Sequence, residues 1–275
     1  MRLVSDPIVA AVQMTSGLSV ADNLATACGL VAEAAARSAC LVVLPENFAF
    51  MGRSEEERRR IVEPLGEGPV QSAVAAAAAG SRIWVIAGTM PIALAGDPRP
   101  ANACLVYDER GRRVARYDKI HLFDVDIPGR DEGYRESANA APGAEPVVVA
   151  TPAGRVGLTV CYDLRFPELY RRLVAEGAEV FTVPAAFTAP TGRAHWEVLL
   201  RARAIENQCF VVAAAQSGFH PNGRETYGDS MVVDSWGRVL RRRPRGTGLV
   251  LAALDRAGQA EARAQFPVLR HRVVE

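Results

Sequence analysis

The sequence predicts a single α/β domain, residues 1–275, built around mixed β-sheets. Short apolar runs of strand length alternate along the chain with longer segments in which apolar residues have helical spacing. A hairpin signal at residues 108–112 (DERGR) interrupts this alternation, so we expect antiparallel strand pairs beside parallel ones. No internal repeat or low-complexity linker divides the chain into smaller units.

The first half of the chain is expected to form short strands and two helices. The expected strands are Ile8–Gln13, Leu41–Leu44, Arg82–Gly88, Ala103–Tyr107 and Arg113–Tyr117. One helix is expected over Val20–Ala36, with Ser19 or Asp22 near its start. The other is expected over Pro69–Ala79, because a proline suits the first turn of a helix.

The second half opens with a long segment, Lys119–Pro142, which is rich in Gly, Pro, Asp and Glu. We expect it to be an irregular loop, and loops of this length in compact domains are often functional. Further strands are expected at 147–150, 156–160, 180–183, 210–215, 231–234, 239–241 and 249–254. Helices are expected at 167–175 and 194–206, and a last one after Asp255.

The charge balance argues against nucleic acid and membranes as partners. The 32 basic and 31 acidic residues leave a formal net charge of +1, which gives no overall field for an anionic partner. Asp6 and Pro7 interrupt the apolar N-terminal stretch, so it does not resemble a secretory signal. The longest uncharged apolar run, near residues 70–79, is far too short to span a bilayer. We therefore expect a cytoplasmic protein.

The cysteines and histidines do not form a metal-binding or disulfide pattern. The five cysteines are scattered without a CxxC motif, and the four histidines form no HxxxH motif. No P-loop or GxGxxG motif is present, so the sequence gives no sign of a bound nucleotide. We expect no metal and no cofactor.

Cys161 differs from the other cysteines in its position. It follows an expected strand and precedes a helix that begins near Pro167, so its side chain is expected at a sheet edge. Backbone N–H groups at such a turn are suited to binding an oxyanion. The other four cysteines (28, 40, 104 and 209) lie in apolar helices or strands and are interpreted as small buried hydrophobic residues.

A cysteine nucleophile needs a proton acceptor, and the residues alone leave its identity open. His195 is one candidate, although a histidine beside a tryptophan at a helix start is more typical of packing or capping. Glu46, after the strand at 41–44, and Lys119, after the strand at 113–117, are the other candidates at strand ends. A solvated carboxylate and a solvated ammonium are the structural alternatives for these two.

Three ordered segments resemble the signature blocks of the nitrilase superfamily of carbon–nitrogen hydrolases. They are LVVLPENF at 41–48, YDKIHLFDVDIPG at 117–129 and GLTVCYDLRFPELYR at 157–171. The family triad of Glu, Lys and Cys corresponds to Glu46, Lys119 and Cys161, each in its matching block. The resemblance thus implies a carboxylate base and a lysine, where residue chemistry alone suggests histidine.

The resemblance also implies further site residues and a fold. A second glutamate, present in many members, corresponds to Glu136, although Asp124, Asp126, Asp131 and Glu132 offer other acids in the same loop. Tyr162, through its backbone N–H, and Arg165 and Phe187 are implied substrate-binding residues; for Arg165 the alternative is an ion pair with Glu168, and for Phe187 core packing. The implied fold is an α-β-β-α sandwich that stacks as a homodimer through helices, one of them Pro167–Ala175.

Within the superfamily, the segments at 194–216 and 227–237 are most similar to the deaminated glutathione amidase branch. The implied function is hydrolysis of a small carboxylate-bearing amide through a cysteine thioester. The alternatives are an ω-amidase acting on α-ketoglutaramate or α-ketosuccinamate, an N-carbamoyl amino acid amidase, a nitrilase, or a non-catalytic binding protein that retains the fold.

Overall fold

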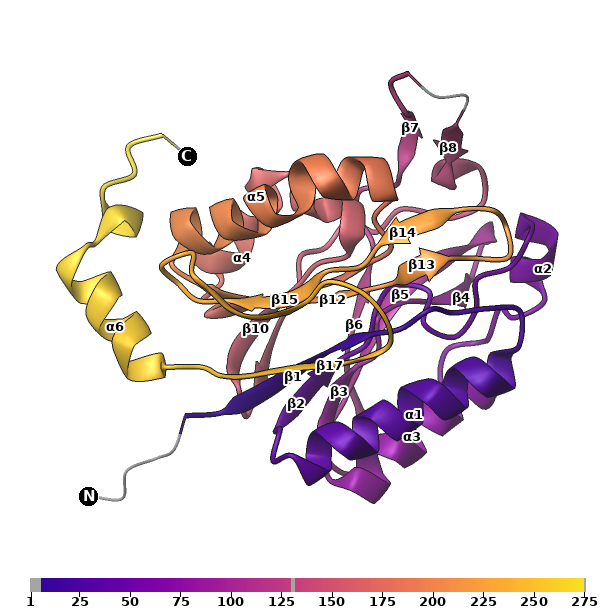
Figure 1. The fold of residues 1–275 in the computed structure, drawn as a ribbon, viewed down its shortest axis with the longest axis horizontal. Helices are drawn as coiled ribbons and strands as arrows, with labels where there is room; N and C mark the ends of the chain where they lie inside the picture. The colour runs from indigo at the N-terminus through magenta and orange to yellow at the C-terminus, as the bar shows by residue number, and fades with distance from the viewer. Residues whose placement is uncertain (1–5, 130–131, 275) are drawn as a thin grey trace.

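Two β-sheets pack face to face between two layers of helices in the computed structural model, which describes residues 6–129 and 132–274. In Figure 1, α1 (Val20–Ala36) and α3 (Pro69–Ser81) lie together on one side of the molecule. On the opposite side lie α4 (Pro167–Ala175) and α5 (Ala189–Asn207). This arrangement is the α-β-β-α sandwich that the resemblance implies.

The first sheet has seven strands in the order β17-β1-β2-β3-β5-β4, with β6 paired to β5. The strands are β1 (Ile8–Gln13), β2 (Leu41–Val43), β3 (Trp84–Ile86), β4 (Met90–Leu94), β5 (Asp97–Tyr107), β6 (Arg113–Asp118) and β17 (Gly248–Ala253). The central strands β1, β2 and β3 are parallel, and the outer pairs are antiparallel. The expected mixture of strand directions is therefore present.

The second sheet has six strands in the order β16-β15-β12-β11-β10-β9. They are β9 (Val148–Thr151), β10 (Gly154–Leu158), β11 (Val180–Ala185), β12 (Phe210–Ala215), β15 (Ser230–Val233) and β16 (Val239–Arg243). Strands β10, β11 and β12 run parallel to one another. Both sheets thus have parallel strands at their centre. Neighbouring parallel strands cannot be joined by a tight turn, so the chain passes through a helix between them.

The alternation of side chains along β1 explains why both faces of the first sheet are apolar. Val9 and Ala11 belong to the core between the two sheets, whereas Ala10 and Val12 belong to the core beneath α1 and α3. All four side chains are fully buried. A strand that is covered on both faces needs apolar side chains at successive positions, which explains the continuous apolar run of β1 in the sequence.

Helices α4 and α5 cover the second sheet in the same way. Leu169 and Leu173 of α4, with Trp196 and Leu200 of α5, are buried in the core that includes β10, β11 and β12. The last helix, α6 (Arg256–Gln265), begins at Asp255, whose Oδ1 accepts a hydrogen bond from the N–H of Gly258 at 2.7 Å. The expected capping role of Asp255 is confirmed.

Several expected boundaries were wrong, and some short elements were not expected. Helix α5 begins at Ala189, five residues before the expected Ala194, because Pro190 suits the first turn of a helix, where its missing N–H is not needed. The segment 119–142 is not entirely irregular, since it contains a small hairpin of β7 (Asp124–Asp126) and β8 (Gly133–Arg135). A second such hairpin, β13 (Ser217–Phe219) with β14 (Glu225–Tyr227), and the short helix α2 (Glu55–Arg59) were not expected.

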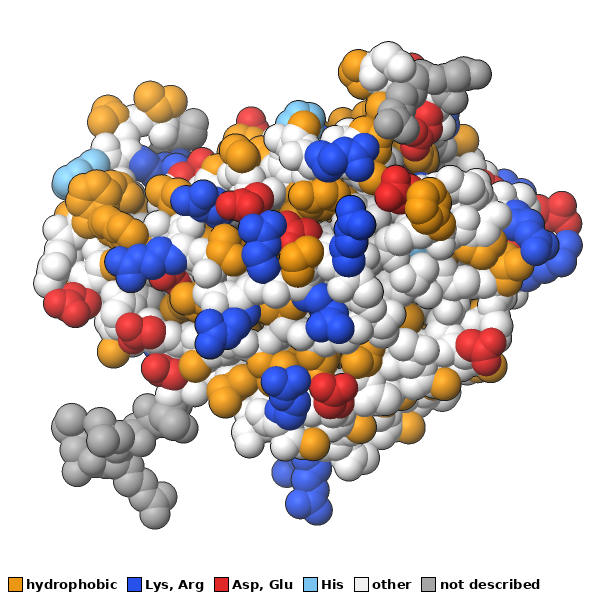
Figure 2. All heavy atoms as spheres, in the orientation of Figure 1, with side chains coloured by type: hydrophobic (Ala, Val, Ile, Leu, Met, Phe, Trp, Pro, Cys, Tyr) orange, Lys and Arg blue, Asp and Glu red, His pale blue; other side chains and the backbone are white. Residues whose placement is uncertain are grey.

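The surface agrees with the near-neutral composition. Figure 2 shows basic and acidic side chains interspersed over the face that carries α5 and β15, without a continuous patch of either sign. Among the helices in the described ranges, none is both long and apolar enough to cross a membrane.

Candidate active site

A cavity of about 460 Å³ lies where strand ends of the two sheets meet. Glu46 follows β2 and Lys119 follows β6 in the first sheet, and Cys161 follows β10 in the second. The seven site residues expected from the sequence all line this cavity: Glu46, Lys119, Glu136, Cys161, Tyr162, Arg165 and Phe187. The size is typical of a small-molecule site.

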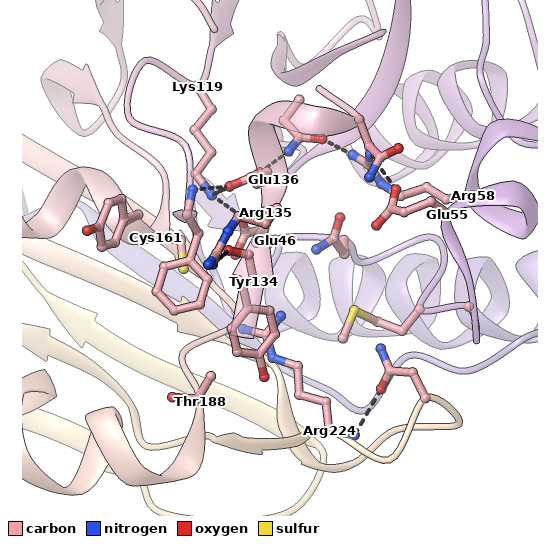
Figure 3. Close-up of a pocket in the computed structure, with 18 of the residues that line it drawn as sticks. Glu46, Glu55, Arg58, Lys119, Tyr134, Arg135, Glu136, Cys161, Thr188 and Arg224 are labelled. Carbon is pink, nitrogen blue, oxygen red and sulfur yellow. Dashed lines mark hydrogen bonds and ion pairs between the residues drawn. The ribbon is translucent and has the colours of Figure 1, made fainter. Parts of the chain in front are cut away.

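Lys119 lies between two carboxylates at the base of the cavity (Figure 3). Its Nζ is 2.8 Å from Oε1 of Glu46 and 2.9 Å from Oε2 of Glu136. The lysine side chain is 2% exposed, so water does not screen these ion pairs as it would at the surface. Burial opposes the charged form of Lys119, but the charges of Glu136 and Glu46 outweigh it and raise the lysine pKa above its ordinary value.

Glu46 is held in one orientation by backbone and side-chain contacts. Its Oε2 accepts a hydrogen bond from the N–H of Ala186 at 2.9 Å, while Oε1 faces Lys119. Burial alone would raise the pKa of Glu46, but the charge and hydrogen bond of Lys119 outweigh it, so this pKa is lowered. A buried carboxylate that stays ionised is suited to accept a proton.

Cys161 lies beside Glu46 and is 6% exposed. Burial raises the pKa of its thiol above the ordinary value, and the negative charge of Glu46 raises it further, although Lys119 opposes this shift. The neighbouring thiol in turn helps to lower the pKa of the Glu46 carboxyl. The resting pair is therefore a protonated thiol next to an ionised carboxylate.

The other four cysteines lie away from the cavity. Cys28 and Cys40 are half-buried, and Cys104 and Cys209 are fully buried in the core that includes both sheets. Burial raises the pKa of each of these thiols. The pKa of Cys161 is raised as well, so a raised pKa does not distinguish it from the other cysteines. Its position beside Glu46 and Lys119 does.

The backbone at Cys161 has an unusual conformation. Its φ is +49°, a left-handed value that costs a residue with a Cβ about 1–2 kcal/mol. The residue opens a short 3₁₀ helix, Cys161–Arg165, directly after β10. Oδ2 of Asp163 accepts a hydrogen bond from the N–H of Val160 at 2.8 Å, which closes the turn around the cysteine.

Asp163 also ties this turn to the strand that carries Lys119. Its Oδ2 accepts a hydrogen bond from the Tyr117 hydroxyl at 2.7 Å. Its Oδ1 lies 3.0 Å from the backbone nitrogen of His121 and 2.7 Å from Nδ1 of the same residue. The carboxylate is fully buried, so four hydrogen bonds replace its hydration. Asp163 therefore joins the Lys119 and Cys161 segments, although it does not line the cavity.

Among the described acids of the 119–142 segment, Glu136 is the one that contacts Lys119. Its Oε2 also accepts a hydrogen bond from the N–H of Phe123 at 2.7 Å, and Asn102 donates to its Oε1. The other acids in the described part have different partners: Asp124 accepts from the N–H of Ser137, Asp126 pairs with Arg135, and Glu132 accepts from the Tyr134 hydroxyl. Asp131 lies outside the described residues.

Arg165 lies against two aromatic rings of the cavity wall. Its guanidinium carbon is 5.3 Å from the ring centre of Phe187 and 5.8 Å from that of Tyr162. The expected alternative, an ion pair with Glu168, is not found among the described residues. Instead, Nη1 of Arg165 is 3.2 Å from Nδ1 of His195 in an exposed contact, and His195 does not line the cavity.

Sequence reasoning missed several residues of this site. Asn102 on β5 and Arg224 and Tyr134 on the two small hairpins line the cavity, as does Arg58 of α2. No local pattern identifies them, because they lie in elements that the sequence did not predict or in the middle of a strand. Asp163 was within a recognised block, but two of its partners, Tyr117 and His121, are more than 40 positions away in the sequence.

The described part of the chain contains no group of three or more His, Cys, Asp or Glu side chains arranged to hold a metal ion. The chemistry available at the cavity is that of a thiol, a carboxylate and a buried ammonium.

The chain matches the model of the carbon–nitrogen hydrolase family over residues 8–264. Among similar proteins, the deaminated glutathione amidase of Yersinia enterocolitica is 43% identical over 96% of this chain and 92% of its own length. The deaminated glutathione amidase of Bos taurus is 45% identical over 97% of this chain and 82% of its own length.

Solved structures have the same fold. The NitFhit protein of C. elegans superimposes with a TM-score of 0.89 at 38% identity, over 98% of this chain and 65% of that protein. Nit3 of Saccharomyces cerevisiae, a member of branch 10 of the nitrilase superfamily, superimposes with a TM-score of 0.88 at 28% identity, over 98% and 97% of the two chains. The expected superfamily and sandwich fold are confirmed. The chain therefore belongs to the carbon–nitrogen hydrolase family and is a hydrolase of carbon–nitrogen bonds other than peptide bonds.

Proposed function

We propose that this enzyme is a thiol-dependent amidase whose substrate is deaminated glutathione. The observation that carries the chemistry is the buried cluster in which Lys119 bridges Glu46 and Glu136 beside the thiol of Cys161. The substrate assignment is supported by relatives named for this activity, which match almost the whole chain at 43% and 45% identity. The substrate's γ-amide joins a 2-oxoglutaryl group to cysteinylglycine.

The first half of the reaction acylates the cysteine. Glu46 takes the proton of the Cys161 thiol, and the sulfur attacks the amide carbon. Negative charge develops on the carbonyl oxygen, where the ammonium of Lys119 and the backbone N–H of Tyr162 stabilise it. One donor of this kind contributes about 3 kcal/mol to lowering the barrier. Glu46 then gives its proton to the leaving nitrogen, the C–N bond breaks, and cysteinylglycine departs from the thioester.

The second half releases the acid. Glu46 takes a proton from water, the hydroxide attacks the thioester carbon, and the C–S bond breaks. The proton on Glu46 returns to the sulfur, so that 2-oxoglutarate leaves and the protonated thiol is restored. Glu136 holds the ammonium of Lys119 in place through both halves, since a cation paired with Glu46 alone would follow that carboxylate as it gains and loses its proton.

Purified protein and its variants test this proposal. The wild type should release cysteinylglycine from deaminated glutathione, and Cys161→Ala should abolish the release. Cys28→Ala is the matched control, because Cys28 lies on α1 against α3 and away from the cavity. Equal turnover by Cys161→Ala and wild type would remove the mechanism. A tenfold preference for α-ketoglutaramate, an N-carbamoyl amino acid or a nitrile over deaminated glutathione would show that the proposed substrate is wrong.

We also propose that the enzyme works as a homodimer in the cytoplasm. Helix α5 exposes Val198 and Ile205, which lie seven residues apart on one helical face and are 68% and 50% exposed. An exposed apolar pair of this kind is suited to packing against a second copy of the chain. Light scattering of the wild type should give twice the chain mass of 29.5 kDa, and Val198→Asp should give the monomer mass. A monomeric wild type would reject the dimer.

A further inference from the structure

We propose that Arg224 binds the terminal carboxylate of the leaving group, and so selects amides whose amine portion ends in a carboxylate. This inference rests on the proposed function, since deaminated glutathione has one carboxylate on its acyl fragment and another on its cysteinylglycine fragment. Arg224 lies between β13 and β14 and lines the cavity (Figure 3).

The first step is the distribution of charge around the cavity. Six cationic side chains line it, and four of them have carboxylate partners: Lys119 with Glu46 and Glu136, Arg53 with Glu57, Arg58 with Glu55, and Arg135 with Asp126. Within the described ranges, Arg165 and Arg224 have no carboxylate at ion-pair distance. Two cations without counterions suit a substrate with two carboxylates.

The second step is the unfilled hydrogen-bonding capacity of Arg224. Its Nη2 donates to the carbonyl oxygen of Ala186, whereas its Nε is buried and has no acceptor among the described residues. A buried donor without an acceptor costs about 1–3 kcal/mol. A ligand carboxylate supplies that acceptor, because the planar guanidinium presents paired N–H groups that match two carboxylate oxygens.

The third step is the rigidity of the guanidinium. Its central carbon lies 4.9 Å from the ring centre of Tyr134 and 6.0 Å from that of Phe123. These two rings are themselves in contact, with centres 4.9 Å apart. The aromatic side chains therefore hold the arginine in place before a ligand arrives, which lowers the entropy cost of binding.

The fourth step identifies which carboxylate Arg224 meets. The carbonyl oxygen of Ala186 accepts from Arg224, and the N–H of the same residue donates to Oε2 of Glu46. In the proposed reaction Glu46 protonates the leaving nitrogen, so the amine fragment extends from the Glu46 side of the cavity. Arg224 is on that side. Arg165 follows the nucleophile and lies against Tyr162 and Phe187, so it remains for the carboxylate of the acyl fragment.

Kinetics with three substrates test the assignment. Deaminated glutathione carries both carboxylates, its C-terminal amide lacks the terminal one, and α-ketoglutaramate has ammonia as its leaving group. Arg224→Gln should lower kcat/KM for deaminated glutathione by roughly 10- to 150-fold, the range of one charged hydrogen-bond pair. The loss should be at least ten times smaller for the other two substrates. Arg224→Lys, which keeps the positive charge but lacks the paired N–H groups of the guanidinium, should recover part of the activity.

Controls separate this inference from the proposed function. Arg193→Gln, an exposed change at the start of α5, should match the wild type on all three substrates. Equal losses by Arg224→Gln on all three substrates would overturn the inference, because Arg224 would then act through Glu46 or the local fold. Wild-type enzyme that ignores deaminated glutathione would reject the proposed substrate, whatever the variants do.

Discussion

Asp163→Asn is the substitution that most directly tests how the site is held together. The change keeps the size of the side chain but replaces one carboxylate oxygen with an NH₂ group. The four contacts of Asp163 come from the backbone of Val160 and His121, from the Tyr117 hydroxyl and from the His121 ring. The hydroxyl and the imidazole can exchange donor and acceptor roles, whereas the two backbone N–H groups cannot.

The cost follows from this asymmetry. One backbone N–H donates to Oδ1 and the other to Oδ2, so either orientation of the asparagine leaves one of them facing an NH₂ group. A buried donor without a partner costs about 1–3 kcal/mol, and the loss of charge weakens the contacts that remain. We expect the free energy of unfolding to fall by roughly 2–4 kcal/mol.

The catalytic effect should exceed the loss of folded protein. Asp163 closes the turn that holds Cys161 at φ +49°, so the thiol is expected to lose its alignment with Glu46. A displacement of about 1 Å at a reacting atom costs on the order of 100-fold in rate. We therefore expect kcat to fall by about that factor, while KM changes little because Asp163 does not line the cavity.

Urea denaturation and steady-state kinetics on the same preparations measure both effects. Asp255→Asn is the matched control, because asparagine caps a helix as well as aspartate does and this residue is exposed. The reasoning is refuted if Asp163→Asn unfolds within 0.5 kcal/mol of the wild type and keeps its kcat. A drop in stability with unchanged kcat would limit Asp163 to a role in folding.

Two further predictions concern the proton acceptor. Glu46→Gln should lower kcat by 10²- to 10⁴-fold, because the proton acceptor is lost. The pH midpoint for alkylation of Cys161 by iodoacetamide should also move to lower pH, since the variant loses a negative charge that raises the thiol pKa and keeps Lys119. An unchanged midpoint would contradict this electrostatic account. In the wild type, kcat/KM should be level through neutral pH and fall only in acid. Lys119 holds the pKa of Glu46 below its ordinary value of 4.5, so activity is lost only as the pH drops through that lowered value. A fall already at pH 6 would show that another group is titrating.

The main layers of the fold could be predicted because their signals are local. Strand β12 and helices α1 and α4 have the bounds that the sequence predicts, since each is a continuous apolar run or a capped periodic segment. The hairpins of β7 with β8 and of β13 with β14 have strands of only three residues, too short to establish an alternating pattern. Their strands are defined by pairing with a neighbour, which a linear sequence does not display.

The site residues likewise fall into those that the sequence could nominate and those that it could not. Glu46, Lys119 and Cys161 each follow a strand, so local reasoning could nominate them, but only the ordered blocks indicated that they belong together. Asp163 and Arg224 could not be nominated. A buried aspartate looks like any turn aspartate until its donors are known, and an arginine in an exposed-looking loop gives no sign that its Nε is enclosed.

The charge balance of the site suits a protonated thiol as the resting state of Cys161. Two carboxylates and one ammonium leave the cluster of Glu46, Glu136 and Lys119 with one negative charge, so a thiolate at Cys161 would add a second charge in a buried place. Burial raises the thiol pKa and the charge of Glu46 raises it further, although Lys119 opposes the shift. When Glu46 accepts the thiol proton, the negative charge only moves from oxygen to sulfur, and attack carries it on to the carbonyl oxygen near Lys119. The net charge of the site is constant throughout, so its buried surroundings need not reorganise as the reaction proceeds.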